Sequence, residues 1–119
     1  MVNLDTHMLV HAFEGKLTAS ERRVLARNPW SISAIVNWEL AKLHQLGRVH
    51  LDLNRPEFLR AMARLHVWPI DWEVACASTR LDFRSDPADE IIAATSLVHG
   101  VPLLTRDRKM LESKLVPLV

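Results

Sequence analysis

Three aspartates of this 119-residue chain stand where they could act together on a ligand. Asp5 ends a short apolar segment, and Asp107 comes just after another, the one that ends near Thr105. Asp89 lies in the first turn of a predicted helix that leads into this second segment. If both segments are parallel strands, their carboxyl ends meet at one edge of the sheet, which is where open α/β sheets bind ligands. The spacing therefore predicts a cluster of carboxylates at that edge.

A fourth acid, Glu39, lies inside a predicted helix. Its i−4 and i+4 neighbours are Ile35 and Leu43, so Glu39 shares the apolar face of that helix. Burying an unpaired carboxylate costs several kcal/mol, so an acid on this face needs a partner or a function. We interpret Glu39 as a member of the same cluster.

Carboxylates gathered in this way suit one kind of chemistry. They repel one another and raise one another's pKa values, and a hard divalent cation removes the conflict. Mg²⁺ and Mn²⁺ prefer oxygen ligands. Such ions activate water and neutralise the charge that builds on a phosphate during in-line displacement.

Taken singly, each acid also has a purely structural explanation. The two aspartates that follow strands could cap the next helices, as could Asp86. Asp89 could be a first-turn acid that the helix dipole favours. Glu39 could pair with Lys42, three residues further along.

The elements that must position these acids alternate between strands and helices. We expect strands at 2–4, 30–33, 67–70, 101–104 and 114–119. We expect helices at 6–13, 18–28, 33–46, 56–65, 71–80, 87–99 and 106–113. This order favours an α/β fold with a mainly parallel sheet. No repeat, low-complexity segment or linker divides the chain, so residues 1–119 are predicted to form a single domain.

Local signals mark several element ends. Thr18 and Glu21 fit a capping box, and Pro69 places the strand near it at an edge of the sheet. Ser85 or Asp86 is expected to cap the helix that has Pro87 at its first position.

Composition limits the cellular location and the kinds of partner that the chain can have. Cys76 is the single cysteine, which excludes a disulfide within one chain and favours a reducing, cytoplasmic location. No uncharged stretch reaches the roughly 20 residues of a membrane-spanning helix, so no membrane association is expected. The net charge is only +1, so RNA binding would need a local basic rim. Candidates for that rim are Arg84, Arg106 and Arg108, with Lys109 beside them.

Three segments resemble, in order and spacing, the PIN-domain ribonucleases. They read LDTHMLVHAF, SAIVNWELAKL and DPADEIIAATSLVHGVPLLTRD. The chain is most similar to the VapC-like toxins of VapBC-type (type II) toxin–antitoxin pairs, and the similarity is weak over residues 48–82. The resemblance implies a PIN-like three-layer α/β/α domain with a mainly parallel central sheet.

The resemblance also assigns roles to residues. In that family, four acids gather around one or two Mg²⁺ or Mn²⁺ ions and direct RNA cleavage, and the matching positions here are Asp5, Glu39, Asp89 and Asp107. Thr6 and Thr105 would be nearby hydroxyls that hold a carboxylate or a metal-bound water. The chain departs from the common pattern at Ser85, where glycine is frequent, and at Glu90, where arginine is frequent. One residue along a helix turns by about 100°, so Glu90 is expected to point away from Asp89.

The function implied is a metal-dependent endoribonuclease that acts as a toxin. Its implied partners are a VapB-like antitoxin that blocks the pocket, an RNA substrate and a second copy of the chain. The alternative is a non-catalytic module of the same fold that binds protein or RNA, with tryptophans as interface anchors. A zinc site at His7 and His11 is disfavoured, because Met8 stands where a zinc protease needs glutamate.

Overall fold

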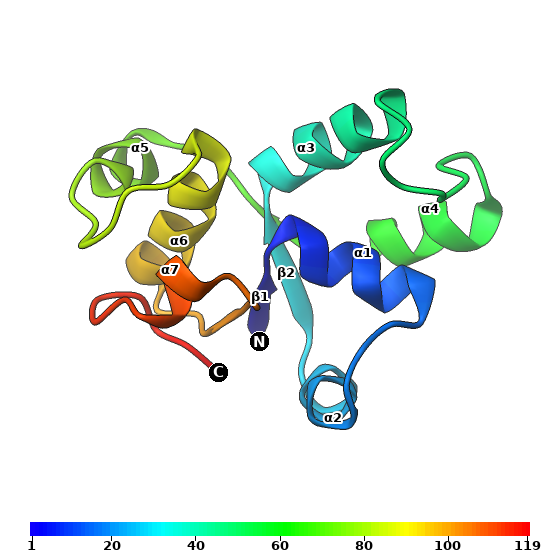
Figure 1. The fold of residues 1–119 in the computed structure, drawn as a ribbon, viewed down its shortest axis with the longest axis horizontal. Helices are drawn as coiled ribbons and strands as arrows, with labels where there is room; N and C mark the ends of the chain where they lie inside the picture. Colours follow the sequence, from blue (N-terminus) through cyan, green and yellow to red (C-terminus); the bar gives the residue numbers. More distant parts are fainter.

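A four-stranded sheet in the order β3-β2-β1-β4 runs through the middle of the molecule, and every pairing is parallel (Figure 1). The structure is a computed structural model that describes all 119 residues, Met1 to Val119. The strands are β1 (Val2–Leu4), β2 (Trp30–Ser33), β3 (His66–Trp68) and β4 (Leu103–Leu104). Because all strands run the same way, their carboxyl ends share one edge of the sheet. The predicted parallel α/β architecture is confirmed.

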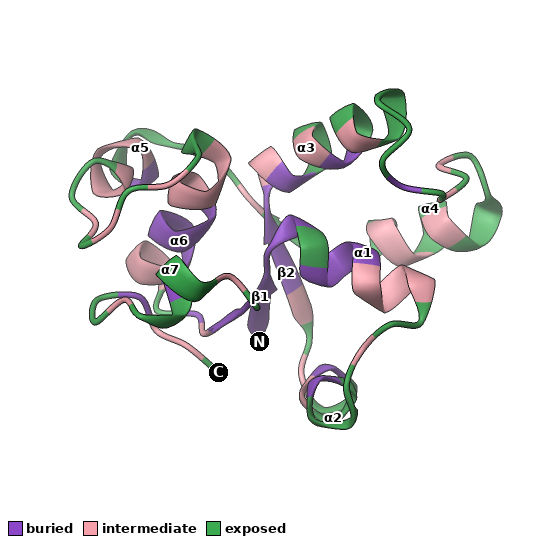
Figure 2. Ribbon diagram, in the orientation of Figure 1, coloured by how far each residue is buried: buried purple, intermediate pink, exposed green.

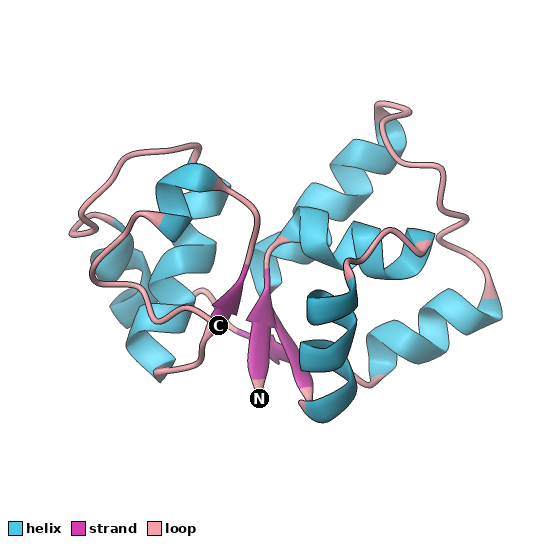
Figure 3. Cartoon of the chain, turned by 60° about the horizontal axis from the view of Figure 1, so that its bottom comes forward, coloured by secondary structure: helices cyan, strands magenta, loops and turns pink.

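Helices cover the sheet from both sides. They are α1 (Thr6–Glu14), α2 (Ala19–Arg27), α3 (Ala34–Gln45), α4 (Pro56–Ala63), α5 (Trp72–Ser78), α6 (Pro87–His99) and α7 (Arg108–Leu111). In Figure 1, α5, α6 and α7 group on one side of the strands, and α1, α3 and α4 on the other. Figure 3 shows the strands between these two groups. No helix is long and apolar enough to cross a membrane.

The core lies between the central strands and the helices beside them. Figure 2 shows the buried residues concentrated in β1, β2, α6 and the inner face of α1. Leu4, Ile32 and Ile92 are completely buried, whereas the edge strand β3 leaves His66 and Val67 exposed. The edge position that Pro69 predicted for β3 is confirmed.

A buried polar network fixes α6 against β1. The Asn3 side chain donates a hydrogen bond to Ser96 Oγ of α6 at 2.9 Å and accepts one from Ser31 Oγ of β2 at 3.3 Å. All three residues are fully buried, so a change in the register of α6 would leave these groups without partners. The network therefore holds the helix that carries Asp89 against the strand that leads into Asp5.

The sequence signals for helix ends are largely confirmed. Thr18 and Glu21 form the complete capping box of α2, and Ser33 caps α3 by accepting a hydrogen bond from the Ile35 amide. Gly100 ends α6 at φ 64°, a backbone conformation that other residues rarely adopt. These ends set the direction in which each helix leaves the sheet.

The strand predicted at 114–119 is wrong. The segment makes only an isolated parallel bridge between Leu103 and Leu118. The Leu103 amide donates to the Pro117 carbonyl at 2.9 Å, and the Val119 amide donates to the Leu103 carbonyl at 3.1 Å. Pro117 has no N–H group, so the ladder cannot extend through it.

Two further predictions were too long. The strand expected at 101–104 is confined to Leu103–Leu104, because the Val101 amide still bonds to the Ser96 carbonyl at the end of α6. The helix expected at 106–113 begins only at Arg108, because Asp107 occupies its N-cap position. Both elements that flank residues 105–107 are therefore very short.

Candidate functional site

The four predicted acids converge on the carboxyl edge of the sheet from four different elements. Asp5 follows β1, Asp107 follows β4, Asp89 is in the first turn of α6 and Glu39 is within α3. The Asp89 pKa is raised, chiefly by burial and further by the charges of Glu39, Asp107 and Asp5. Every member of the set therefore acts electrostatically on Asp89, as the spacing of the acids predicted.

Asp5 is the most buried of these acids, with an exposed fraction of 5%. Its Oδ1 accepts a hydrogen bond from the Met8 amide at 2.8 Å, which caps α1, and its Oδ2 accepts one from the Thr105 hydroxyl. Leu4 pairs with Leu104 across β1 and β4, so the two strand ends bring Asp5 and Thr105 together. Burial raises the Asp5 pKa even though both hydrogen bonds oppose the rise. Asp5 thus has a structural role as a cap and a place in the acidic cluster.

Hydroxyl groups hold three of the four carboxylates. The pairs are Thr105 with Asp5, Thr6 with Glu39 at 2.5 Å, and Ser85 with Asp89 at 3.0 Å. The two threonines that the family resemblance singled out therefore both contact a cluster acid. A hydroxyl is a neutral donor, so it fixes the direction of a carboxylate without removing its charge.

Asp107 is held mainly by backbone groups. Its Oδ1 accepts from the Met110 amide at 3.1 Å, and its own amide donates to Thr105 Oγ1 at 3.0 Å. The Thr105 hydroxyl thus donates to Asp5 and accepts from Asp107. One small side chain therefore links the acid after β1 with the acid after β4.

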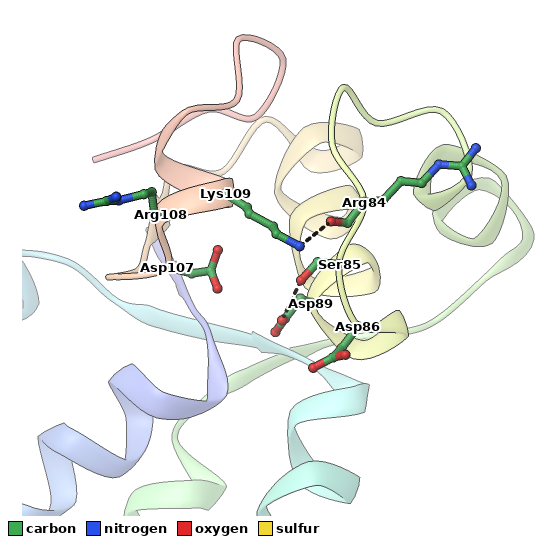
Figure 4. A pocket seen from close by; sticks show the side chains of 7 residues that line it. All are labelled: Arg84, Ser85, Asp86, Asp89, Asp107, Arg108 and Lys109. Carbon is green, nitrogen blue, oxygen red and sulfur yellow. Dashed lines mark hydrogen bonds between the residues drawn. The ribbon is translucent and has the colours of Figure 1, made fainter.

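Two adjoining pockets share Asp89 and Asp107 as lining residues. The larger pocket, of about 500 Å³, lies between α6 and α7 (Figure 4). Its other lining residues are Arg84, Ser85, Asp86, Arg108 and Lys109. The smaller pocket, of about 200 Å³, also contains Asp5, with His7, Met8, His11, Arg106 and Met110. Asp89 and Asp107 therefore lie between a pocket with three basic side chains and a pocket with two imidazoles, and Glu39 lines neither pocket.

The basic residues predicted as an RNA-binding rim divide into two kinds. Arg84 and Arg108 are exposed at the larger pocket, and Lys109 Nζ donates to the Arg84 carbonyl at 3.0 Å (Figure 4). Arg106 is instead engaged by Glu21 of α2, through Nε at 2.9 Å and Nη2 at 2.7 Å. The hydrogen bonds from Arg106 lower the Glu21 pKa to about 2.

The start of α6 differs in one detail from the expectation. Asp86 is at the N-cap position with Pro87 after it, but its side chain makes no capping hydrogen bond, so its predicted capping role is wrong. The Ser85 amide instead donates to Glu90 Oε2 at 3.4 Å, while the Ser85 hydroxyl donates to Asp89. Glu90 lines a separate pocket that contains neither Asp89 nor Asp107, which confirms that it points away from Asp89.

The model of the PIN domain family matches residues 2–114 of the chain. This chain belongs to the PIN domain family. A curated relative, Ribonuclease VapC22 of Mycobacterium tuberculosis (strain ATCC 25618 / H37Rv), is 33% identical over 84 residues. The match covers 67% of this chain and 64% of VapC22, so it spans slightly less than two-thirds of the relative.

Solved structures share the fold of this PIN domain. A VapBC2 complex from Rickettsia felis, bound to a DNA fragment from its promoter, matches with TM-score 0.73 and 18% identity over 100% of this chain and 98% of the other. A toxin–antitoxin complex from Klebsiella pneumoniae matches with TM-score 0.71 and 21% identity, and the match covers 94% of this chain and 91% of the other. FitAcB from Neisseria gonorrhoeae matches with TM-score 0.65 and 21% identity, and the match covers 92% of this chain and 90% of the other. These likenesses confirm the predicted three-layer PIN fold.

The donor set of this PIN domain fits a hard divalent cation. The cluster offers carboxylate and hydroxyl oxygens, the kind of ligand that Mg²⁺ and Mn²⁺ prefer. Burial and mutual repulsion raise the pKa values of Asp5 and Asp89, a conflict that a cation would relieve. No three His, Cys, Asp or Glu side chains lie close enough together to hold one ion. That spacing is compatible with Mg²⁺, which typically binds through one or two carboxylates and retains several waters.

Sequence reasoning missed three contributors to the site. Ser85 was noted only as a possible helix cap and as a departure from the family pattern, although a hydroxyl four residues before an acid can reach it. Glu21 was assigned only to the capping box, and its pairing with Arg106 across 85 residues has no local signal. The histidines of α1 were considered only as zinc ligands, whereas their i, i+4 spacing also places both on the smaller pocket.

The acids make the stability of the metal-free PIN domain depend on pH. A carboxyl whose pKa is higher in the folded state stabilises the fold fully below its unfolded value, here 3.8. That contribution is lost as pH rises through the raised pKa values of Asp5 and Asp89. We therefore expect Asp89→Asn to gain melting temperature relative to the wild type in EDTA as the pH rises above about 4. Parallel curves for both proteins would contradict the assignment.

Proposed function

We propose that this PIN domain is a Mg²⁺- or Mn²⁺-dependent endoribonuclease and the toxin of a toxin–antitoxin pair. The observation that carries the proposal is the convergence of Asp5, Glu39, Asp89 and Asp107, of which Asp89 and Asp107 line a pocket that also contains Arg84, Arg108 and Lys109. The name of the curated relative, a ribonuclease, and the toxin–antitoxin complexes among the structural relatives support it.

Asp5 and Asp89 would hold the ion directly, and Asp107 and Glu39 would bind its waters or a second ion. When bound, such an ion activates water and stabilises the charge that develops on the scissile phosphate. The protein's own contribution is to bring the carboxylates together and to orient them. Hydroxyls do the orienting: Thr6 and Ser85 each contact one oxygen of Glu39 and Asp89 and leave the other available, whereas both oxygens of Asp5 accept hydrogen bonds.

RNA would enter along the basic side of the acids. Arg84 and Arg108 extend outward from the pocket, where they can neutralise phosphates further along the RNA strand, and Lys109 holds the segment that carries Arg84 (Figure 4). The smaller pocket, which shares Asp89 and Asp107 with the larger one, offers space for the RNA strand on the other side of these acids. Space on both sides of the reacting phosphate suits cleavage within a strand, so we propose an endonuclease.

The same proposal includes partners and setting. An antitoxin of the VapB kind would cover the acidic site, and a second copy of the chain would complete a homodimer. The single cysteine supports a reducing, cytoplasmic environment.

The experiment that tests the proposal is cleavage of single-stranded RNA by the purified protein with Mg²⁺, with Mn²⁺ and with excess EDTA. We expect internal cleavage products with either metal and none with EDTA. Intact RNA that nevertheless binds the protein, with or without metal, would contradict the enzyme assignment and favour the non-catalytic binding module. Cleavage that persists in EDTA would contradict the role of the metal.

A further inference from the structure

Residues 105–107 carry two groups of the candidate site on a segment with little local structure. Thr105 donates to Asp5, and Asp107 lines both pockets. The strand before the segment has two residues and the helix after it has four. Elements this short supply few backbone hydrogen bonds, so the position of the segment depends on contacts made elsewhere.

Arg106 makes such contacts on the side of the segment that faces α2. Its Nε and Nη2 donate to the two carboxylate oxygens of Glu21 at 2.9 and 2.7 Å, and Nη2 also donates to the Lys16 carbonyl at 3.0 Å. The planar guanidinium fork fixes direction as well as distance, which a lysine ammonium cannot do. One side chain thereby attaches the segment to the start of α2 and to the loop before it.

Glu21 is a rigid anchor for this contact. Its side chain is only 11% exposed, and its Oε1 also accepts the Thr18 amide at 2.8 Å in the capping box. The hydrogen bonds from Arg106 keep the carboxylate ionised, with a pKa of about 2. Glu21 is therefore held in place by contacts within α2 that do not depend on Arg106.

We propose that Arg106 is a positioning residue, which acts through Glu21 to hold Thr105 and Asp107 in place for metal binding. The proposal deepens the proposed function and rests on it for the consequence to metal affinity. The competing role, direct contact with RNA, has some support, because Arg106 is 43% exposed and lines the smaller pocket. The two roles predict opposite effects of Glu21→Gln, which removes the charge and the acceptor of Arg106 Nε and so weakens the anchor and loosens the guanidinium.

The test is a double-mutant cycle of Glu21→Gln, Arg106→Gln and the double variant. We expect each single change to weaken Mn²⁺ binding to the RNA-free protein by about 10-fold, the low end for groups that orient ligands. The double variant should bind no more weakly than either single variant. Arg106→Lys should fail to restore affinity. Glu57→Gln is the matched control, because this acid is exposed in the first turn of α4 and should change nothing.

A second measurement does not depend on metal. The Asp107 amide donates to Thr105 Oγ1, so its hydrogen exchange should quicken in Glu21→Gln. Unchanged exchange in that variant would overturn the positioning role. Additive losses, or a loss of RNA affinity in Arg106→Gln with Mn²⁺ affinity intact, would overturn it as well. If the wild-type protein bound no Mn²⁺, the proposed function would fail, and the exchange measurement would still decide the role of Arg106.

Glu21→Gln is the more conservative variant of the pair. Glutamine has almost the same shape, and its amide oxygen can still accept the Thr18 amide, so α2 keeps its cap. Thermal unfolding of each variant then shows whether a loss of affinity has a global cause. If the melting temperature of a variant fell while the hydrogen exchange of the Asp107 amide stayed unchanged, the result would count against the proposal.

Discussion

Asp89→Asn is expected to abolish metal-dependent RNA cleavage and to make the metal-free protein more stable. Loss of a direct metal ligand should lower the cleavage rate by about 100-fold or more. Stability should rise because burial and three neighbouring acids oppose the ionised Asp89. Asparagine keeps an oxygen that can accept the Ser85 hydroxyl, so the start of α6 is preserved.

The measurements are initial cleavage rates at saturating Mn²⁺ and melting temperatures in EDTA near pH 7. Glu73→Gln is a matched control, because this acid is exposed in the first turn of α5 and is not part of either pocket. It should leave both quantities almost unchanged. Cleavage by Asp89→Asn within about 10-fold of the wild type, or a lower melting temperature, would show that Asp89 is not a strained metal ligand.

Asp5→Ala and Asp5→Asn are both expected to be inactive, but they should differ strongly in stability. Both remove the buried charge, so their difference reports the hydrogen bonds together with the packing of the side-chain end group. Alanine leaves the Met8 amide and the Thr105 hydroxyl without a partner, whereas asparagine can accept from either. We expect the free energy of unfolding of Asp5→Ala to be about 2 to 3 kcal/mol lower than that of Asp5→Asn.

Chemical denaturation of the two variants in EDTA measures this difference. A difference below about 0.5 kcal/mol would mean that Asp5 does not cap α1 in solution. Cleavage by Asp5→Asn at the wild-type rate would instead remove Asp5 from the metal site. The stability and activity results thus separate the two roles that the structure combines in one residue.

The sequence predicted the parts of the fold that depend on neighbouring residues. Strands β1 and β2 have the predicted bounds, and the capping box at Thr18 and the turn at Gly100 were recognisable from a few letters. The positions of the acids were also predictable, because parallel strand ends must share an edge. The strand predicted at 114–119 is wrong because the apolar pattern of this segment suits a strand, whereas Pro117 interrupts the hydrogen-bond ladder with β4.

Contacts between distant segments were beyond sequence reasoning. Neither composition nor periodicity indicates the bidentate pair of Arg106 with Glu21. From the sequence, Arg106 was predicted to bind RNA. The link from Thr105 to both Asp5 and Asp107 depends on the register of β1 against β4, which a single sequence does not define.

The sheet order also has a consequence for biosynthesis. The neighbours of β1 in the sheet are β2 and β4, and because β4 comes much later in the chain, Asp5 meets Thr105 only after the residues up to Thr105 have been made. A growing chain that has emerged as far as α5 already contains Asp5 and Glu39, but neither Asp89 nor Asp107. The acidic site therefore cannot assemble on a growing chain that ends before Asp107, and under the proposed function such an intermediate would not cleave the RNA around it.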